Sequence, residues 1–148
     1  MVDRFKQFSF SIFEISRCWH KLASEVMSRY GLKGPHAIYL VVLLHNPDGL
    51  TSAQLTETCG RDKADVSRAL SIMESSDIVY RQRGNAYRAK LYLTPKGIAA
   101  AEDVCRIASV AVEQGGKGIS DDERIIFYRA LSSITKNLTR LSQEGFPE

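Results

Sequence analysis

Apolar side chains recur at alternating spacings of three and four residues near both ends of this chain. Near the N-terminus the pattern predicts one long amphipathic helix, which Gly31 and the Gly34-Pro35 pair end. Near the C-terminus the same spacing follows Ser120 and Glu123, a capping-box pair that marks a helix start. The N-terminal seam comprises Phe5, Phe8, Ile12, Ile15, Trp19, Leu22 and Val26, and the C-terminal seam comprises Phe127, Leu131, Ile134, Leu138 and Leu141.

These two seams have two alternative partners. A single amphipathic helix most commonly packs on the core of its own molecule. The region between the two helices, however, is too small to offer intramolecular surface for both seams. The pattern therefore favours a homodimer in which the terminal helices of two chains pack together.

Shorter helices are predicted between the seams. Residues 35–45 form one apolar helical segment, and Thr51 and Gln54 form the capping box of a second helix, which Gly60 ends. Asp62 is placed to cap a third helix. The apolar face of this third helix comprises Val66, Ala69, Leu70 and Met73. Two short helices joined by a glycine-containing turn are typical of the helix-turn-helix, whose second helix can lie in the DNA major groove.

Two strands follow this helix pair. Residues 78–80 and 91–93 are rich in β-branched and aromatic side chains, and the polar loop between them contains Gly84 and Asn85. Thr94-Pro95 then begins another helix, with threonine as the N-cap and proline at the first helical position. The predicted fold class is mainly α with a small β-hairpin wing, a winged helix-turn-helix core flanked by N- and C-terminal dimerisation helices.

The composition describes an ordinary globular chain. It has 148 residues, 25% of them charged, and its longest apolar run, residues 37–44, is too short to cross a bilayer. The first residues lack the features of a secretory signal, so we expect a soluble cytoplasmic protein. Cys18, Cys59 and Cys105 are odd in number and widely spaced, which favours reduced thiols over disulfides or a zinc site. We expect no metal and no cofactor.

The net charge of +3 is too small to identify a partner, so the placement of the charges matters. Basic residues gather in the wing and at the start of the third helix, the elements that a winged helix presents to DNA. Ser67 and Arg68 project opposite Val66, where arginine can bond to a guanine edge and serine to a base or phosphate. The alternatives are a solvated polar serine and an ion pair between Arg68 and Asp65. The basic set is Arg61, Lys63, Arg68, Arg81, Arg83, Arg88 and Lys90.

Four segments resemble the MarR family of winged helix-turn-helix transcriptional regulators in order and spacing: residues 55–57, 63–70, 78–81 and 88–97. The resemblance runs from about residue 35 to 100. It implies a homodimer whose recognition helices enter consecutive major grooves while the wings reach adjacent minor grooves. Many members of the family release DNA when they bind small, often aromatic, acids.

The resemblance also implies residue roles. Within a single chain, 1–148, we expect dimerisation helices in residues 1–33 and 98–148 and the DNA-binding region in residues 34–97. The expected function is that of a sequence-specific repressor acting on a pseudo-palindromic operator. The candidate DNA-binding residues are Ser52, Arg61, Lys63, Ala64, Asp65, Ser67, Arg68, Arg81, Arg83, Arg88 and Lys90. The candidate residues for a small aromatic or acidic effector are Trp19, Tyr30, His36, Tyr39 and His45, with plain core packing as the alternative.

Two positions depart from the family pattern. Ala86 stands two residues before Arg88, where the family's wings usually carry an acidic residue, so one partner of the bracing salt bridge is missing. Asp77 stands where the family usually has glycine. Because aspartate reaches a left-handed conformation at modest cost, we expect this turn to form.

An enzyme is not expected. His20, His36 and His45 are scattered, and the sequence lacks a Cys-x-x-Cys pair, a glycine-rich phosphate loop and a Gly-x-Ser-x-Gly motif. Two alternatives remain open. One is a winged helix that binds only proteins, which a wing of balanced charge would favour more than this basic one. The other is a thiol-based redox sensor through Cys18, which lies near Arg17, although a small buried core residue is the commoner role.

Overall fold

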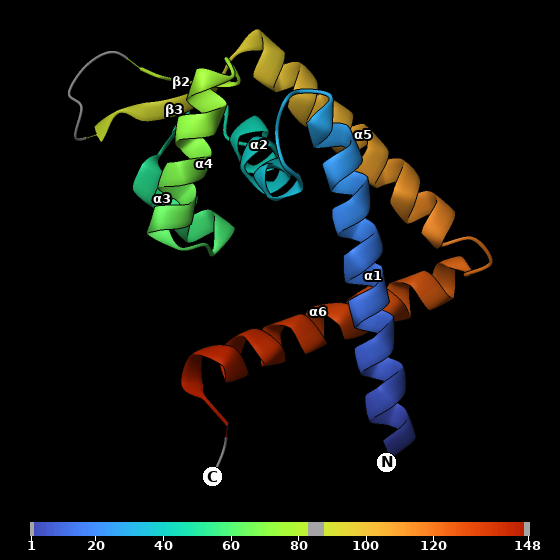
Figure 1. Cartoon of the computed structure of the whole chain (residues 1–148). Helices are drawn as coiled ribbons and strands as arrows, with labels where there is room; N and C mark the ends of the chain where they lie inside the picture. Colours follow the sequence, from blue (N-terminus) through green and yellow to red (C-terminus); the bar gives the residue numbers. More distant parts are fainter. Residues whose placement is uncertain (1, 83–87, 147–148) are drawn as a thin grey trace. The chain divides into compact units, whose positions relative to one another are not determined.

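The computed structural model describes residues 2–82 and 88–146 of the chain (Figure 1). The chain divides into two compact units, Met1–Ser109 and Val110–Glu148. Five residues of the predicted wing loop lie outside the described ranges: Arg83, Gly84, Asn85, Ala86 and Tyr87.

The N-terminal unit contains a long first helix, several shorter helices, a small antiparallel sheet and most of a second long helix. In chain order its elements are α1 (Val2–Ser28), the 3-10 turn η1 (Gly34–His36), α2 (Ala37–Leu44), β1 (Leu50–Thr51), α3 (Ser52–Cys59), α4 (Lys63–Ser75), β2 (Val79–Arg81), β3 (Lys90–Leu93) and most of α5 (Pro95–Gly115). The C-terminal unit contains the end of α5 and α6 (Asp121–Glu144). The predicted fold class, mainly α with a β-hairpin wing, is confirmed. None of the described helices is both long and apolar enough to span a membrane.

Local capping interactions start the two helices of the helix-turn-helix. The Gln54 N–H donates to Thr51 Oγ1 at 3.2 Å, and the Thr51 N–H donates to Gln54 Oε1 at 2.9 Å, which confirms the capping box of α3. Gly60 ends α3 with a φ of 58°. Asp62 Oδ1 accepts the Ala64 N–H at 2.7 Å and begins α4. These caps place the turn between α3 and α4 within a few residues.

The sheet has three strands in the order β1-β3-β2. In β2 and β3, Val79 pairs with Leu93 and Tyr80 with Tyr92, so the predicted hairpin is confirmed. The third strand, β1, pairs with β3 but was not predicted. Its two residues are too few to produce an alternating pattern, and their partners, Leu91 and Lys90, lie far along the chain.

A single hydrophobic core in the N-terminal unit fixes the orientation of α4. The predicted apolar face of this helix is buried, with Val66, Leu70 and Met73 each at most 1% exposed. Because side chains on one face of a helix share a direction, burial of this face directs the opposite face to solvent. Side chains from other elements complete the core, among them Leu40, Leu55, Ile78, Leu91 and Ala100.

One threonine joins the sheet to the start of α5. The Thr94 hydroxyl donates to the Asp77 carbonyl at 2.6 Å and accepts the Gly97 N–H at 3.0 Å. A glycine is required at position 97 because a Cβ there would lie 2.0 Å from the Ile78 carbonyl oxygen. Asp77 adopts a left-handed conformation with a φ of 58°, which confirms that aspartate supports this turn.

Most side chains of the two predicted seams are exposed on the single chain. In the N-terminal seam Phe5 is 72% exposed, and only Val26, at 3%, is buried. In the C-terminal seam Leu138 is 49% exposed, whereas Leu131 and Leu141 are partly buried. The other exposed seam residues are Phe8, Ile12, Ile15, Trp19, Phe127 and Ile134. Both seams therefore form apolar surface that the chain itself leaves largely uncovered.

Candidate nucleic-acid interface

The outer face of α4 carries five of the predicted DNA-binding residues. All five are exposed. Ala64 and Arg68 lie on the side of the helix away from the buried residues Val66 and Leu70, whereas Lys63 is exposed because it stands at the first position of the helix. Backbone N–H groups at the start of α4 add a weak positive pole close to this face. The five residues are Lys63, Ala64, Asp65, Ser67 and Arg68.

Arg68 is held by an acidic neighbour on the same helix. Its guanidinium pairs with the Asp65 carboxylate one turn earlier, and both side chains are more than half exposed. The sequence left two roles open for Arg68, a bond to a guanine edge and an ion pair with Asp65, and the second is present in this structure. An exposed pair contributes only about 0–1 kcal/mol, so a base edge or phosphate can replace it.

The turn before α4 adds further exposed charge. Arg61 and Lys63 flank the capping residue Asp62, and all three side chains are exposed. Ser52, at the first position of α3, is partly buried, and its hydroxyl accepts a hydrogen bond from Arg81 at 3.3 Å. The structure therefore presents Arg61 and Lys63 to solvent but directs Ser52 towards the sheet.

The described basic residues of the wing differ in their surroundings. Arg88 is exposed. Lys90 Nζ donates to the Asp48 carbonyl at 3.1 Å, and Arg81 Nε donates to Glu74 Oε1 at 2.5 Å. Two of the predicted DNA contacts, Arg81 and Lys90, are thus engaged by the protein itself, whereas Arg83 lies outside the described residues.

A pair of stacked tyrosines, missed in the sequence, covers one face of the wing. Tyr80 and Tyr92 are cross-strand partners whose ring centroids lie 5.5 Å apart. The Tyr92 hydroxyl donates to the Asp48 carbonyl at 3.1 Å. Gly49 lies beneath this ring with a φ of 77°, and a Cβ there would come within 2.6 Å of it. The signal was present in the sequence, since the two tyrosines occupy matching positions of the predicted strands.

The five predicted effector residues have different environments. Trp19 and His45 are exposed, whereas Tyr39 lies in the core and Tyr30 packs at the edge of it. His36 is buried, and its Nδ1 accepts the Lys33 N–H at 3.1 Å. Burial lowers the pKa of His36 and raises the pKa values of Tyr30 and Tyr39.

Tyr30 belongs to a polar cluster that the sequence did not indicate. Its hydroxyl donates to Asp103 at 3.4 Å, and Arg29 donates to the same carboxylate at 3.3 Å. Arg106 also pairs with Asp103, and this hydrogen bond is the largest cause of the lowered pKa of Asp103. The cluster ties the segment after α1 to the middle of α5.

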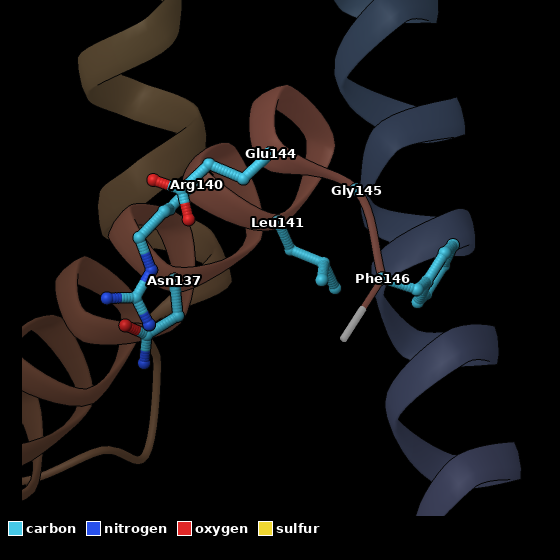
Figure 2. Close-up of a pocket in the computed structure, with 6 residues that line it drawn as sticks. All are labelled: Asn137, Arg140, Leu141, Glu144, Gly145 and Phe146. Carbon is cyan, nitrogen blue, oxygen red and sulfur yellow. The ribbon is translucent and has the colours of Figure 1, made fainter. Parts of the chain in front are cut away.

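An open hollow lies at the C-terminal end of α6 (Figure 2). The predicted effector residues take no part in its lining. Its lining residues are Asn137, Arg140, Leu141, Glu144, Gly145 and Phe146.

All three cysteines are free thiols. Cys18 is exposed, and its thiol donates to Glu14 Oε1 at 3.9 Å, while Arg17 pairs with the same carboxylate. Cys59 and Cys105 are partly buried, and burial raises the pKa of the Cys59 thiol. Glu14 therefore already neutralises the positive charge of Arg17, the basic neighbour of the Cys18 thiol.

Comparison with known proteins shows which family model and which solved structures this chain is similar to. Residues 30–86 match the family model described as the MarR family. The chain is similar to the transcriptional regulator SlyA, with 22% identity and a TM-score of 0.79 over 90% of this chain and 94% of that one. It is also similar to a putative MarR family transcriptional regulator from Listeria monocytogenes complexed with 26mer DNA, with 20% identity and a TM-score of 0.78 over 93% and 95% of the two chains.

A third similar structure is an S. aureus MepR-DNA complex, with 22% identity and a TM-score of 0.77 over 88% of this chain and 96% of that one. At these identities the solved structures establish the fold. Together with the family match they confirm the resemblance that the sequence motifs indicated.

Proposed function

We propose that the protein is a transcriptional regulator of the MarR kind that binds duplex DNA in a sequence-specific manner, because residues 30–86 match the MarR family model. The observation that carries this proposal is the division of α4 into two faces. One face is anchored in the core through Val66 and Leu70, and the other presents Ser67 and Arg68 to solvent. A helix held rigidly in this way can read base edges in a major groove.

The exposed cations beside α4 support the same proposal. Arg61 and Lys63 at the helix start and Arg88 in the wing are suited to phosphate oxygens or to a narrow minor groove. Two similar proteins are described as complexes with DNA, which favours this use of the fold. In this proposal residues 34–97 form the DNA-binding region, and the protein performs no catalysis.

We further propose that the protein acts as a homodimer. Exposed aromatic and aliphatic side chains on α1 and α6 form apolar surfaces of the kind that a second subunit covers. Residues 1–33 and 98–148 are the dimerisation helices in this arrangement. A two-fold dimer presents two α4 helices and therefore reads two half-sites of a pseudo-palindrome.

The regulatory part of the proposal is repression in the cytoplasm, relieved by a small aromatic or acidic effector. Three of the candidate residues, Tyr30, His36 and Tyr39, lie in or beside the core of the N-terminal unit. Aromatic rings and an imidazole there provide the flat apolar walls and the polar groups that such acids require. A ligand bound among these residues would alter the packing of the core to which the buried face of α4 also belongs.

Selection from a randomised duplex pool tests the proposed function directly. Fragments retained by the purified protein should contain a pseudo-palindrome whose half-sites lie about 10 base pairs, or one helical turn, apart. Retained fragments with no shared sequence would contradict sequence-specific binding. Failure to retain any duplex at low salt would contradict DNA binding altogether and favour a protein-interaction module.

A further inference from the structure

The alternation of side chains along β2 directs Arg81 towards the helices. Arg81 is the cross-strand partner of Leu91, and Val79 is the partner of Leu93, so these four side chains share one face of the sheet. Val79 and Leu91 are buried on this face, whereas Tyr80 is half exposed on the other. Arg81 thus extends from the helix-facing side of the strand.

On that side one guanidinium contacts both helices of the helix-turn-helix. Arg81 Nε donates to Glu74 Oε1, near the end of α4, at 2.5 Å. Arg81 Nη1 donates to Ser52 Oγ, at the start of α3, at 3.3 Å. The side chains of Arg81 and Glu74 are 42% and 32% exposed, so the pair is partly shielded from water. A planar guanidinium can hold two acceptors at fixed angles, which an ammonium group cannot do.

We propose that Arg81 is a positioning residue for DNA recognition, which holds the wing and α4 in one orientation through Glu74 and Ser52 and does not itself bind a phosphate. This inference rests on the proposed DNA-binding function. Glu74 already neutralises the charge of Arg81, so the pair adds little to the attraction of the protein for the phosphate backbone. The ion pair contributes by fixing geometry, because contacts of α4 with bases and contacts of the wing with DNA phosphates must form together.

A positioning role and a phosphate-binding role for Arg81 predict opposite effects of the variant Glu74→Gln. If Arg81 positions α4, this nearly isosteric change weakens the ion pair and reduces affinity for the selected duplex about three- to tenfold. If Arg81 binds a phosphate, the same change removes a nearby negative charge and strengthens binding to every duplex. Titrations with a duplex selected by the wild-type protein and with random duplex separate these outcomes.

The salt dependence of binding gives a second, independent readout. We expect Arg81→Ala to lower affinity for the selected duplex more than for random duplex, with no change in the slope of log affinity against log salt. The double variant with Glu74→Gln should lose little further affinity for the selected duplex, because both changes break the same ion pair. Arg88→Ala is the matched control, since it removes an exposed wing arginine and should lower the slope.

Two controls distinguish a loss of folding from a loss of DNA recognition. Thermal unfolding of each variant establishes that it is folded at the assay temperature, and Ser52→Ala provides a milder variant that breaks one hydrogen bond only. A slope lowered by about one unit in Arg81→Ala, or stronger binding by Glu74→Gln, would overturn the inference while leaving the proposed function intact. A wild-type protein that binds no duplex would instead overturn the proposed function, and with it any role of Arg81 in recognition.

Discussion

Asp65 and Arg68 form an ion pair on the exposed face of α4, with both side chains more than half accessible to solvent. The carboxylate therefore holds the guanidinium against the helix in the free protein. Because the buried face of α4 fixes the direction of this pair, both groups lie on the solvent-exposed side of the helix, the side that the proposed function assigns to the major groove.

Replacement of Arg68 should affect sequence preference more than general attraction to DNA. We expect Arg68→Ala to cost about 1–3 kcal/mol of specific binding and to relax the preference at one position of each half-site. The measurement is a set of binding isotherms on the selected duplex and on duplexes with single base-pair changes. Asp65→Asn is the control, because it breaks the pair but keeps the arginine and should preserve the preference. Unchanged discrimination in Arg68→Ala would mean that Arg68 makes no base contact.

The wing should act through charge. Arg88 is exposed, and we expect Arg88→Ala to weaken binding to all duplexes nearly alike. The slope of log affinity against log salt should fall by about one unit per lost contact, and a symmetric dimer doubles this change. Arg83→Ala should behave in the same way. Lys136→Ala on α6 removes the same charge from another element and serves as the control. If Arg88→Ala keeps both the wild-type affinity and the wild-type slope, the wing is only a solvated surface.

Some parts of this structure could be predicted because their chemistry is local. The capping box of Thr51 and Gln54 forms within four residues, and the exposed position of Ser67 follows from the burial of Val66 one residue before it. Strand β1 could not be predicted, because its pairing with Leu91 joins distant segments and leaves no periodic pattern. Non-local contacts of this kind depend on the packed fold.

The difference between local and non-local contacts also applies to the charged residues of the candidate nucleic-acid interface. A basic wing is visible in the sequence, but the contacts that engage two of its cations are not. Glu74 lies seven residues before Arg81, across a turn, and Ser52 lies 29 residues before it. Lys90 reaches a backbone carbonyl 42 residues away. The placement of charges along the sequence therefore identified the basic element, whereas only the folded arrangement distinguishes a cation held by the protein from one exposed to solvent.

The exposed seams predict a stable dimer. Sedimentation at micromolar concentration should give about twice the chain mass of 16.5 kDa. Replacing both Leu131 and Leu138 with aspartate should dissociate or unfold the protein, since each change places a charge in an apolar interface. Lys136→Asp alters the charge of the same helix outside the seam and should leave the dimer intact. A wild-type protein that sediments only as a monomer would contradict the prediction.

An effector that enters the core should be detectable through the single tryptophan. Trp19 is 44% exposed on α1, so ligand binding or a shift of this helix should change its fluorescence. We expect salicylate-like acids to alter this signal and to lower affinity for the selected duplex. Tyr39→Phe, which removes only a hydroxyl from the core, tests whether that group contacts the ligand. Compounds that change neither the fluorescence nor the DNA affinity would argue against this ligand class.

Protonation of His36 should destabilise the folded chain at mildly acidic pH. The side chain is 6% exposed, and its Nδ1 accepts the Lys33 N–H, so the folded state needs the neutral ring. Burial, with a smaller effect of the Lys33 charge, lowers the pKa of His36 below its ordinary value of 6.5. In the unfolded chain the imidazole takes up a proton near pH 6.5, but in the folded chain it does so only at lower pH.

The unfolded state therefore binds more protons in this window, and the free energy of unfolding should fall as the pH drops below about 6.5, by at most about 1.4 kcal/mol per pH unit from this group. His36→Asn keeps an acceptor for the Lys33 N–H but does not titrate, so it should flatten the dependence. The pH dependence is measured by urea unfolding at several pH values between about 7.5 and 5, which bracket the ordinary histidine pKa of about 6.5. His20→Asn, at an exposed position of α1, should retain the wild-type dependence. An equal fall in stability for the wild type and His36→Asn would assign the effect to other groups.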